Sequence, residues 1–253
     1  MIGATAFSAS LLAASLGLWS HVSAPARLTL SASPTHVALV AGARRAVRVT
    51  ARGARPLVVQ ASVAGLGLDL GGRPRIVRPG DAAPWISVSP HRLTVDRGGA
   101  ALVVSSRRAA GARPGDHSAV VLLTVVAPSA GGVVVRMRIG LVVSVRVAGA
   151  LVHRLEVHAA RVRRSGRARL IELSLANRGN VIESIGPGRL EVALVRRGRV
   201  VAQLRSARRE ILPRSKGIVD LRYGGSVRGV VVARVELGQP SGRRRVRSFA
   251  VRL

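Results

Sequence analysis

The sequence predicts an all-β protein in which two tandem immunoglobulin-like β-sandwich domains follow an N-terminal signal or anchor helix. Three observations predict this architecture. Short runs of alternating apolar and polar residues fill most of the chain, turn-forming residues separate the runs, and residues 1–26 contain no Lys, Arg, Asp or Glu. The expected division is residues 1–26 for the signal peptide or anchor, 27–149 for the first sandwich and 150–253 for the second.

The N-terminal segment has two interpretations. Residues 4–19 form an apolar stretch, and Ala24 and Ala26 flank Pro25 in the A-x-A form that a signal peptidase accepts. An uncleaved anchor is the alternative, because the stretch is close to the ~20 residues that span a bilayer. Both interpretations predict an exported protein that is extracytoplasmic, at the cell surface or anchored in a membrane.

Alternating runs in the first half predict half-buried strands. Three short runs have this pattern: residues 45–52, 85–89 and 92–96. Residues 134–147 form a longer run, in which arginine marks the solvent face and Val or Ile the buried face. The expected domain boundary follows at Gly149. The glycine-rich residues 65–72 predict a flexible loop or a bulged hairpin, because no helical period follows them.

The second half repeats the pattern. Its expected strands are residues 167–175, 190–195, 200–204, 217–222, 230–237 and 246–251. Residues 196–199 predict a hairpin turn between two of these strands. Many short strands at even spacing are typical of a sandwich or barrel.

The net charge of +30 has two explanations. An anionic partner would select for it, and a GC-rich genome would produce it without any function, since Lys216 is the only lysine among many arginines. Arginine along strands also protects exposed sheet edges. Sequence-specific nucleic-acid recognition is not predicted, because no basic run contains the stacking aromatics that single-strand binders use.

The candidate contact residues for a ligand or an acidic polymer are Arg243, Arg244, Arg245, Arg247 and Trp85. The four arginines form a compact basic cluster, which a solvated hairpin explains equally well. Trp85 is either a core anchor between the sheets or a platform for stacking a sugar. Its position after Pro84 and before a strand favours the core.

No catalytic constellation is evident, so an enzyme, a cofactor and a metal site are not predicted. The chain has no cysteine, and its six histidines lack metal-ligand spacing. His153 and His158 are expected on opposite faces of one strand. Three aspartates are expected at turns: Asp81, Asp96 and Asp116. Two glutamates are expected on strands and paired with arginines: Glu172 and Glu191.

Several sequence segments, taken together, resemble those of a known family. They are the Trp85 strand, the Pro114-Gly115-Asp116 turn into an apolar strand, the long strand that ends at Gly149, the turn at residues 177–180, and residues 210–213. This order resembles the DUF916-type domain, the immunoglobulin-like module of cell-surface proteins that act with WxL proteins. The resemblance covers about residues 28–253. It implies that the first module binds peptidoglycan and the second a surface partner.

The leading functional hypothesis is a non-catalytic cell-envelope binding or adaptor protein, whose partner is a wall polymer or a surface protein. One alternative is an assembly factor similar to pilus chaperones, which would act by edge-strand pairing with secreted subunits. The other alternative is a non-specific polyanion binder that uses the arginine-rich surface.

Overall fold

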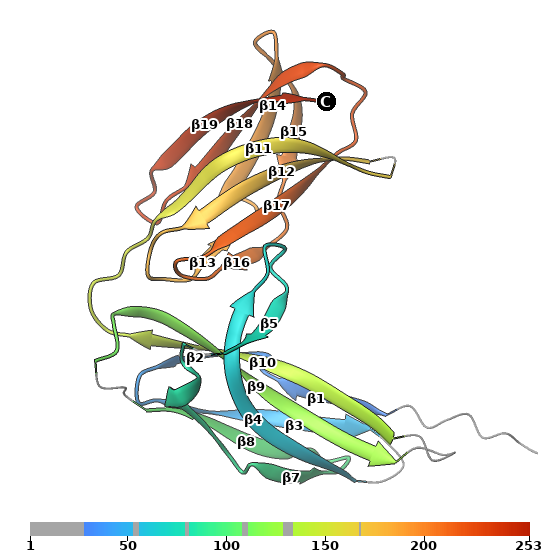
Figure 1. Cartoon of the computed structure of the whole chain (residues 1–253), viewed down its shortest axis with the longest axis vertical. Coiled ribbons are helices and arrows are strands. Elements are labelled where there is room, and N and C mark those ends of the chain that lie inside the picture. Colours follow the sequence, from blue (N-terminus) through green and yellow to red (C-terminus); the bar gives the residue numbers. More distant parts are fainter. Residues whose placement is uncertain (1–27, 53–55, 79–80, 108–110, 129–133, 167) are drawn as a thin grey trace, which may run out of the picture.

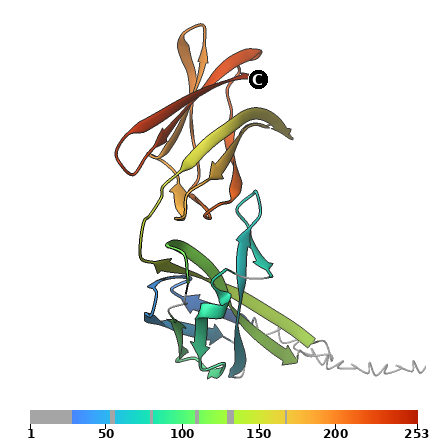
Figure 2. The same ribbon diagram turned by 60° about the vertical axis from the view of Figure 1, so that its left-hand side comes forward.

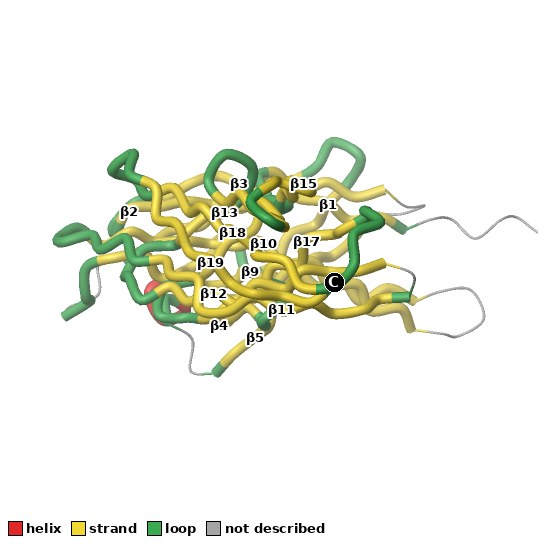
Figure 3. Tube along the Cα trace, turned by 90° about the horizontal axis from the view of Figure 1, so that it is seen from above, coloured by secondary structure: helices red, strands yellow, loops and turns green. Residues whose placement is uncertain are grey.

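The computed structural model describes residues 28–253 except 53–55, 79–80, 108–110, 129–133 and 167. Every regular element of the described chain is a β-strand except one short 3₁₀ turn, η1 (Ala83–Trp85) (Figure 3). The expected signal peptide or anchor, residues 1–26, lies outside the described residues. Among those that are described, no helix has the length and hydrophobicity that a membrane span requires.

The N-terminal part of the chain forms two facing sheets (Figure 1). The first has the order β1-β3-β8-β6 and contains β1 (Thr29–Ser33), β3 (Arg44–Arg52), β8 (Ala100–Ser106) and β6 (Ile86–Ser89). The second has the order β2-β10-β9-β4-β5, with β7 beside β4. Its strands are β2 (His36–Val40), β10 (Val134–Val147), β9 (Gly115–Pro128), β4 (Leu57–Leu68), β5 (Pro74–Val77) and β7 (Arg92–Val95).

The first two strands of the chain belong to different sheets. β1 pairs antiparallel with β3, and β2, which follows after Pro34, pairs parallel with residues 142–146 of β10. β2 is much shorter than the 14-residue β10. One edge of β10 is therefore covered only over its second half.

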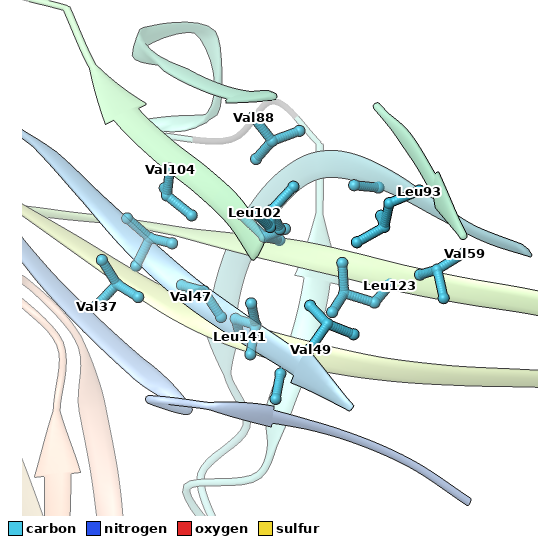
Figure 4. Packing of buried hydrophobic residues seen from close by; sticks show 14 of the residues in the cluster. Val37, Val47, Val49, Val59, Val88, Leu93, Leu102, Val104, Leu123 and Leu141 are labelled. Carbon is cyan, nitrogen blue, oxygen red and sulfur yellow. The ribbon is translucent and has the colours of Figure 1, made fainter. Parts of the chain in front are cut away.

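Aliphatic side chains fill the space between these two sheets (Figure 4). Val47, Val49, Leu102 and Leu123 are fully buried and come from strands of both sheets. Burying each such side chain contributes about 1.5–3 kcal/mol relative to leaving it in water. The alternation of the sequence produces this core, because successive side chains of a strand point to opposite faces.

The C-terminal part has a core cluster of its own, which includes Ile171, Leu173, Leu194 and Leu221. One sheet contains β11 (Leu155–Ser165), β12 (Ala168–Asn177) and β17 (Lys216–Tyr223). A second contains β15 (Arg199–Arg205), β14 (Leu190–Arg196), β18 (Val230–Gly238) and β19 (Arg244–Arg252). A small pair joins β13 (Glu183–Ile185) to β16 (Arg209–Ile211).

The β4–β5 hairpin extends from the N-terminal part toward the C-terminal part (Figure 2). At its tip the backbone N–H of Ile218 donates to the carbonyl of Leu70 at 2.7 Å. The hairpin agrees with one of the two expectations for residues 65–72. The expected domain boundary at Gly149 stays a prediction, as does the count of two domains.

Most expected strands are present, including the whole of residues 134–147, and the turn between β14 and β15 has positive φ at Arg197 and Gly198. Trp85 was expected on a strand, but it ends η1, because Pro84 fits the first turn of a helix. His153 was expected on a strand with His158, but it lies in the connection before β11. Asp116 was expected at a turn, but it is buried on β9.

Candidate functional site

The uncovered edge of β10 is the most distinctive feature of the N-terminal part. β9 pairs with β10 along its whole length, whereas β2 reaches only residues 142–146 on the other side. In the part of the chain that the structure describes, no strand pairs with that side of residues 134–140. We call these residues the free half of β10. An edge of this kind is a template for pairing with another strand.

The hydrogen bonds at the covered half show which residues point to this edge. The N–H of Val142 donates to the carbonyl of Thr35 at 3.0 Å, and the carbonyl of Arg146 accepts from the N–H of Ala41 at 3.1 Å. Even-numbered residues of β10 therefore direct their backbone groups to the β2 side. By the alternation of an antiparallel strand, the unpaired groups of the free half belong to Val134, Arg136, Arg138 and Gly140.

The two faces of the free half differ in chemistry. Met137 and Ile139 are half-buried and pack against the core, in line with the buried Leu141. Arg136 and Arg138 lie on the opposite face and are exposed. On the other sheet, Leu30 of β1 contributes to the same core. The edge thus combines unpaired backbone groups, an apolar inner row and a cationic outer row.

Asp116 fixes the far end of the β9–β10 pair. Its carboxylate accepts two hydrogen bonds from Arg146, at 2.7 and 2.9 Å, and one from the backbone N–H of Ile182 at 2.9 Å. Burial alone would raise the pKa of Asp116, but the hydrogen bonds from Arg146 and Ile182 hold the pKa below its usual value. The same ion pair raises the pKa of Arg146.

Asn180 joins the two parts of the chain beside this ion pair. Its side-chain amide donates to the carbonyls of Pro114 and Ala150, at 3.0 and 2.8 Å, and its amide oxygen accepts from the N–H of Val152 at 2.7 Å. Its backbone carbonyl accepts from the N–H of Asp116 at 2.8 Å. These contacts from Asn180 therefore hold the start of β9 and the connection that follows β10.

Trp85 packs on His117 and on the core. The ring centroids of Trp85 and His117 lie 4.7 Å apart, and His117 is buried on β9. The His117 ring lies between the carboxylate of Asp81, 2.9 Å from Nδ1, and the carbonyl of Arg113, 2.8 Å from Nε2. These contacts place Trp85 in the N-terminal part, away from the basic cluster.

The four arginines of the basic cluster do not form one surface. Arg243 precedes β19, and Arg244 pairs on one face of the sheet with Glu191 and Glu236, at 2.9 and 3.4 Å. The hydrogen bond that Arg244 donates to the carboxylate of Glu191 is the largest cause that raises the pKa of Arg244.

Two other members of the cluster lie on the opposite face. Arg245 and Arg247 stand opposite Leu237 and Val235 in the β18–β19 register. Together with Leu155 of β11 they line a cavity of about 50 Å³. Alternation along β19 splits the cluster between two faces.

The expected pairing of the two strand glutamates is confirmed. Glu172 pairs with Arg161 and Arg163, and Glu191 pairs with Arg244. Among the described residues, no group of three or more His, Asp or Glu side chains could hold a metal ion. The sequence alone predicts neither the Asp116–Arg146 pair nor the free half of β10. Each depends on contacts between distant segments, and the one local signal was the length of the run at residues 134–147.

No family model matches the sequence, and no curated protein matches it. Among solved structures, the chain is similar to the class 5 fimbriae chaperone CfaA, with 12% identity and a TM-score of 0.52, over 87% of this chain and 99% of that chain. It is also similar to a chain in a chaperone–tip adhesin complex that is vital for activation of CFA/I fimbriae biogenesis. There the identity is 9% and the TM-score 0.52, over 87% of this chain and 98% of that chain. These likenesses show that the chain shares the all-β fold of these two structures.

Proposed function

We propose that the protein is a non-catalytic, extracytoplasmic assembly chaperone that holds a surface-protein subunit by pairing one of its strands with the free half of β10. The observation that carries this proposal is the unpaired edge of residues 134–140 beside the apolar row of Met137 and Ile139. The fold shared with fimbrial chaperones supports it. We also propose that the N-terminal segment directs export and that two tandem domains meet near Gly149.

An added strand would pair the free backbone groups of this edge and cover its half-buried apolar side chains. The backbone groups of four residues can each form hydrogen bonds that contribute about 0.5–1.5 kcal/mol. Alternate side chains of the added strand would cover Met137 and Ile139, which are only half-buried in the free protein. Main-chain hydrogen bonds then supply affinity, and the apolar contacts select for strands with an apolar face.

The template is already extended before a partner arrives. β9 pairs with every residue of β10, and the Asp116–Arg146 pair anchors the end of both strands. A preformed strand loses less conformational entropy on binding than a flexible segment does. The edge therefore acts as a rigid template, onto which a less ordered subunit strand is added.

The wall-polymer adaptor that led the sequence hypotheses has weaker support. Its candidate polyanion contact, the cluster at Arg243, Arg244, Arg245 and Arg247, is divided between two faces, and glutamates neutralise Arg244. A surface protein, the other partner considered in that hypothesis, is the partner that edge pairing requires.

A proline substitution tests the proposal at one backbone group. Arg138→Pro removes an N–H that faces the free edge, while the ladder to β9 uses the odd-numbered residues. Arg138→Ala is the matched control, because it removes the same charge and keeps the N–H. The probe is a labelled synthetic peptide with Val or Ile at alternate positions, measured by fluorescence anisotropy with the full chain.

We expect Arg138→Pro to bind this peptide about tenfold more weakly than Arg138→Ala, because a hydrogen bond is lost and the ring obstructs the added strand. Hydrogen exchange should show peptide-dependent protection of the amides of Arg136 and Arg138. Equal affinity of the two variants, or protection at β15 or β19 instead, would count against pairing at β10.

A further inference from the structure

We infer that the strand captured by the free half of β10 carries acidic residues on its outward face, opposite Arg136 and Arg138. This inference rests on the proposed function and specifies the chemistry of the partner. It follows from the direction of the side chains, from the charges that surround them and from the carboxylates that the described structure places elsewhere.

Side-chain direction comes first. Arg136 and Arg138, whose backbone groups are unpaired at the edge, also have side chains that point outward. A strand that pairs with these residues places alternate side chains on the same outer face. Directly opposite residues have Cβ atoms about 4.5–5.5 Å apart, so their charges interact.

A row of polar side chains continues from this edge across the sheet. In the strand register, Arg138 stands beside Thr124, Thr124 beside Gln60, and Gln60 beside Arg92. The guanidinium of Arg138 donates to the hydroxyl of Thr124 at 3.3 Å. Together with Arg136, these residues line a shallow depression of about 530 Å³.

No acidic residue lines this depression, and the described ion pairs include none for Arg92, Arg136 or Arg138. Elsewhere the protein places its carboxylates beside arginines, as it does for Arg146, Arg161 and Arg244. The outer face beside the free edge thus holds three exposed cations without a counter-charge. Acidic side chains on the added strand would supply that charge.

Protection against self-association is the simpler explanation for Arg136 and Arg138, since charges on an edge strand prevent pairing between copies. That role is fulfilled by charge of either sign. Selection of an acidic strand requires positive charge. Reversing the sign of the two side chains therefore separates the explanations.

The experiment compares three synthetic peptides with identical Val and Ile positions and with Glu, Ser or Lys at the positions between. Each is titrated against the full wild-type chain and the full-length Arg136→Glu/Arg138→Glu variant, at low and high salt. The control variant is Arg196→Glu/Arg199→Glu, which reverses an exposed cross-strand pair of arginines on the β14–β15 hairpin.

The wild type should bind the Glu peptide about threefold to thirtyfold more tightly than the Lys peptide, with the Ser peptide between them. The order should reverse in Arg136→Glu/Arg138→Glu and stay unchanged in Arg196→Glu/Arg199→Glu. High salt should reduce the differences, because these side chains are exposed.

Equal binding of all three peptides would overturn the inference and leave edge pairing intact. Binding of none of them would overturn the proposed function and the inference with it. A Glu peptide whose Val and Ile are replaced by Ser distinguishes a third case. If it binds as tightly as the original, the surface recognises an anionic polymer and not a strand, and the inference is wrong.

Discussion

The free half of β10 and the strand β19 are both edges rich in arginine, yet only β19 also places arginine on its inner face. On β10, Met137 and Ile139 face the core and the arginines face outward. On β19, Arg245 and Arg247 lie on the inner face with Val235 and Leu237. Inward-pointing charges are a known defence against strand addition. The proposed pairing at β10 therefore depends on which face of a strand carries the charge, and not on the presence of charge alone.

Giving β10 the pattern of β19 should have the largest effect. In Met137→Arg/Ile139→Arg the inner row becomes charged, so an added strand would bury two cations instead of covering two apolar side chains. We expect the affinity for the alternating Val/Ile peptide to fall about a hundredfold in anisotropy titrations.

Urea denaturation of Met137→Arg/Ile139→Arg should show that the variant remains folded, because both positions are only half-buried. Arg136→Ala/Arg138→Ala is the control, because it changes two side chains of the same strand and leaves the inner row apolar. Undiminished peptide binding by the variant with inner arginines would contradict the contrast between the two edges.

Loss of the Asp116 carboxylate should have the next largest effect. In Asp116→Asn, Arg146 loses its charged partner, and the free energy of unfolding in urea should fall by about 1–3 kcal/mol at neutral pH. Because the folded-state pKa of Asp116 is below its usual value, its contribution is fully present above about pH 4 and is lost as the pH falls through the folded-state pKa.

The difference in unfolding free energy between wild type and Asp116→Asn should therefore shrink in acid below about pH 4. Hydrogen exchange of residues 142–147 should also accelerate in this variant, while β19 exchanges as before. A difference that grows toward low pH would contradict the assigned role of the ion pair.

Removal of the inner charges should make β19 a receptive edge. Arg245→Leu/Arg247→Val restores an apolar inner row opposite Leu237 and Val235. We expect concentration-dependent self-association in analytical ultracentrifugation at protein concentrations where the wild type is monomeric. The control variant is Arg243→Leu/Arg252→Val, which removes two charges and keeps Arg245 and Arg247. If the control variant self-associates and Arg245→Leu/Arg247→Val does not, the inner position of the charges is not what protects the edge.

Arg244→Ala should have the smallest effect. The side chain is exposed and pairs with Glu191 on the outer face of the sheet, where solvent screens the ion pair. The urea midpoint of this variant should match that of the wild type. The variant should also remain monomeric, because its inner arginines are unchanged. A large shift would show that the outer face of β19 contributes more to stability than its exposure indicates.

The strands could be predicted from the sequence because alternation is a local signal, as residues 134–147 show. The pairing of β2 with the end of β10 could not, because no local pattern connects His36 to Ser144, 108 residues later, although their side chains hydrogen-bond at 3.2 Å. The free half of β10 exists only as a consequence of that pairing. The sequence therefore identified the strand but not its edge.

The positions of some individual residues also depend on contacts between distant segments, so the sequence does not predict them. Asp116 follows a glycine and a proline, which is typical of a turn, but Arg146 and Ile182 determine its burial from far along the chain. The sequence does not show that the basic cluster at the start of β19 is divided between two faces, because the inner face of that strand is evident only from its register with β18.

The change of sheets by β1 and β2 has a consequence for the order in which the protein folds. Thr35 and His36 are synthesised well before their partner strand, which is completed only at Val147. Contacts over such long separations form slowly, because a large loop must close before they are made. A growing chain that stops short of β10 leaves β2 and β9 without their common neighbour. β2 and β9 therefore gain their common neighbour, and the free half of that neighbour, in the same step of folding.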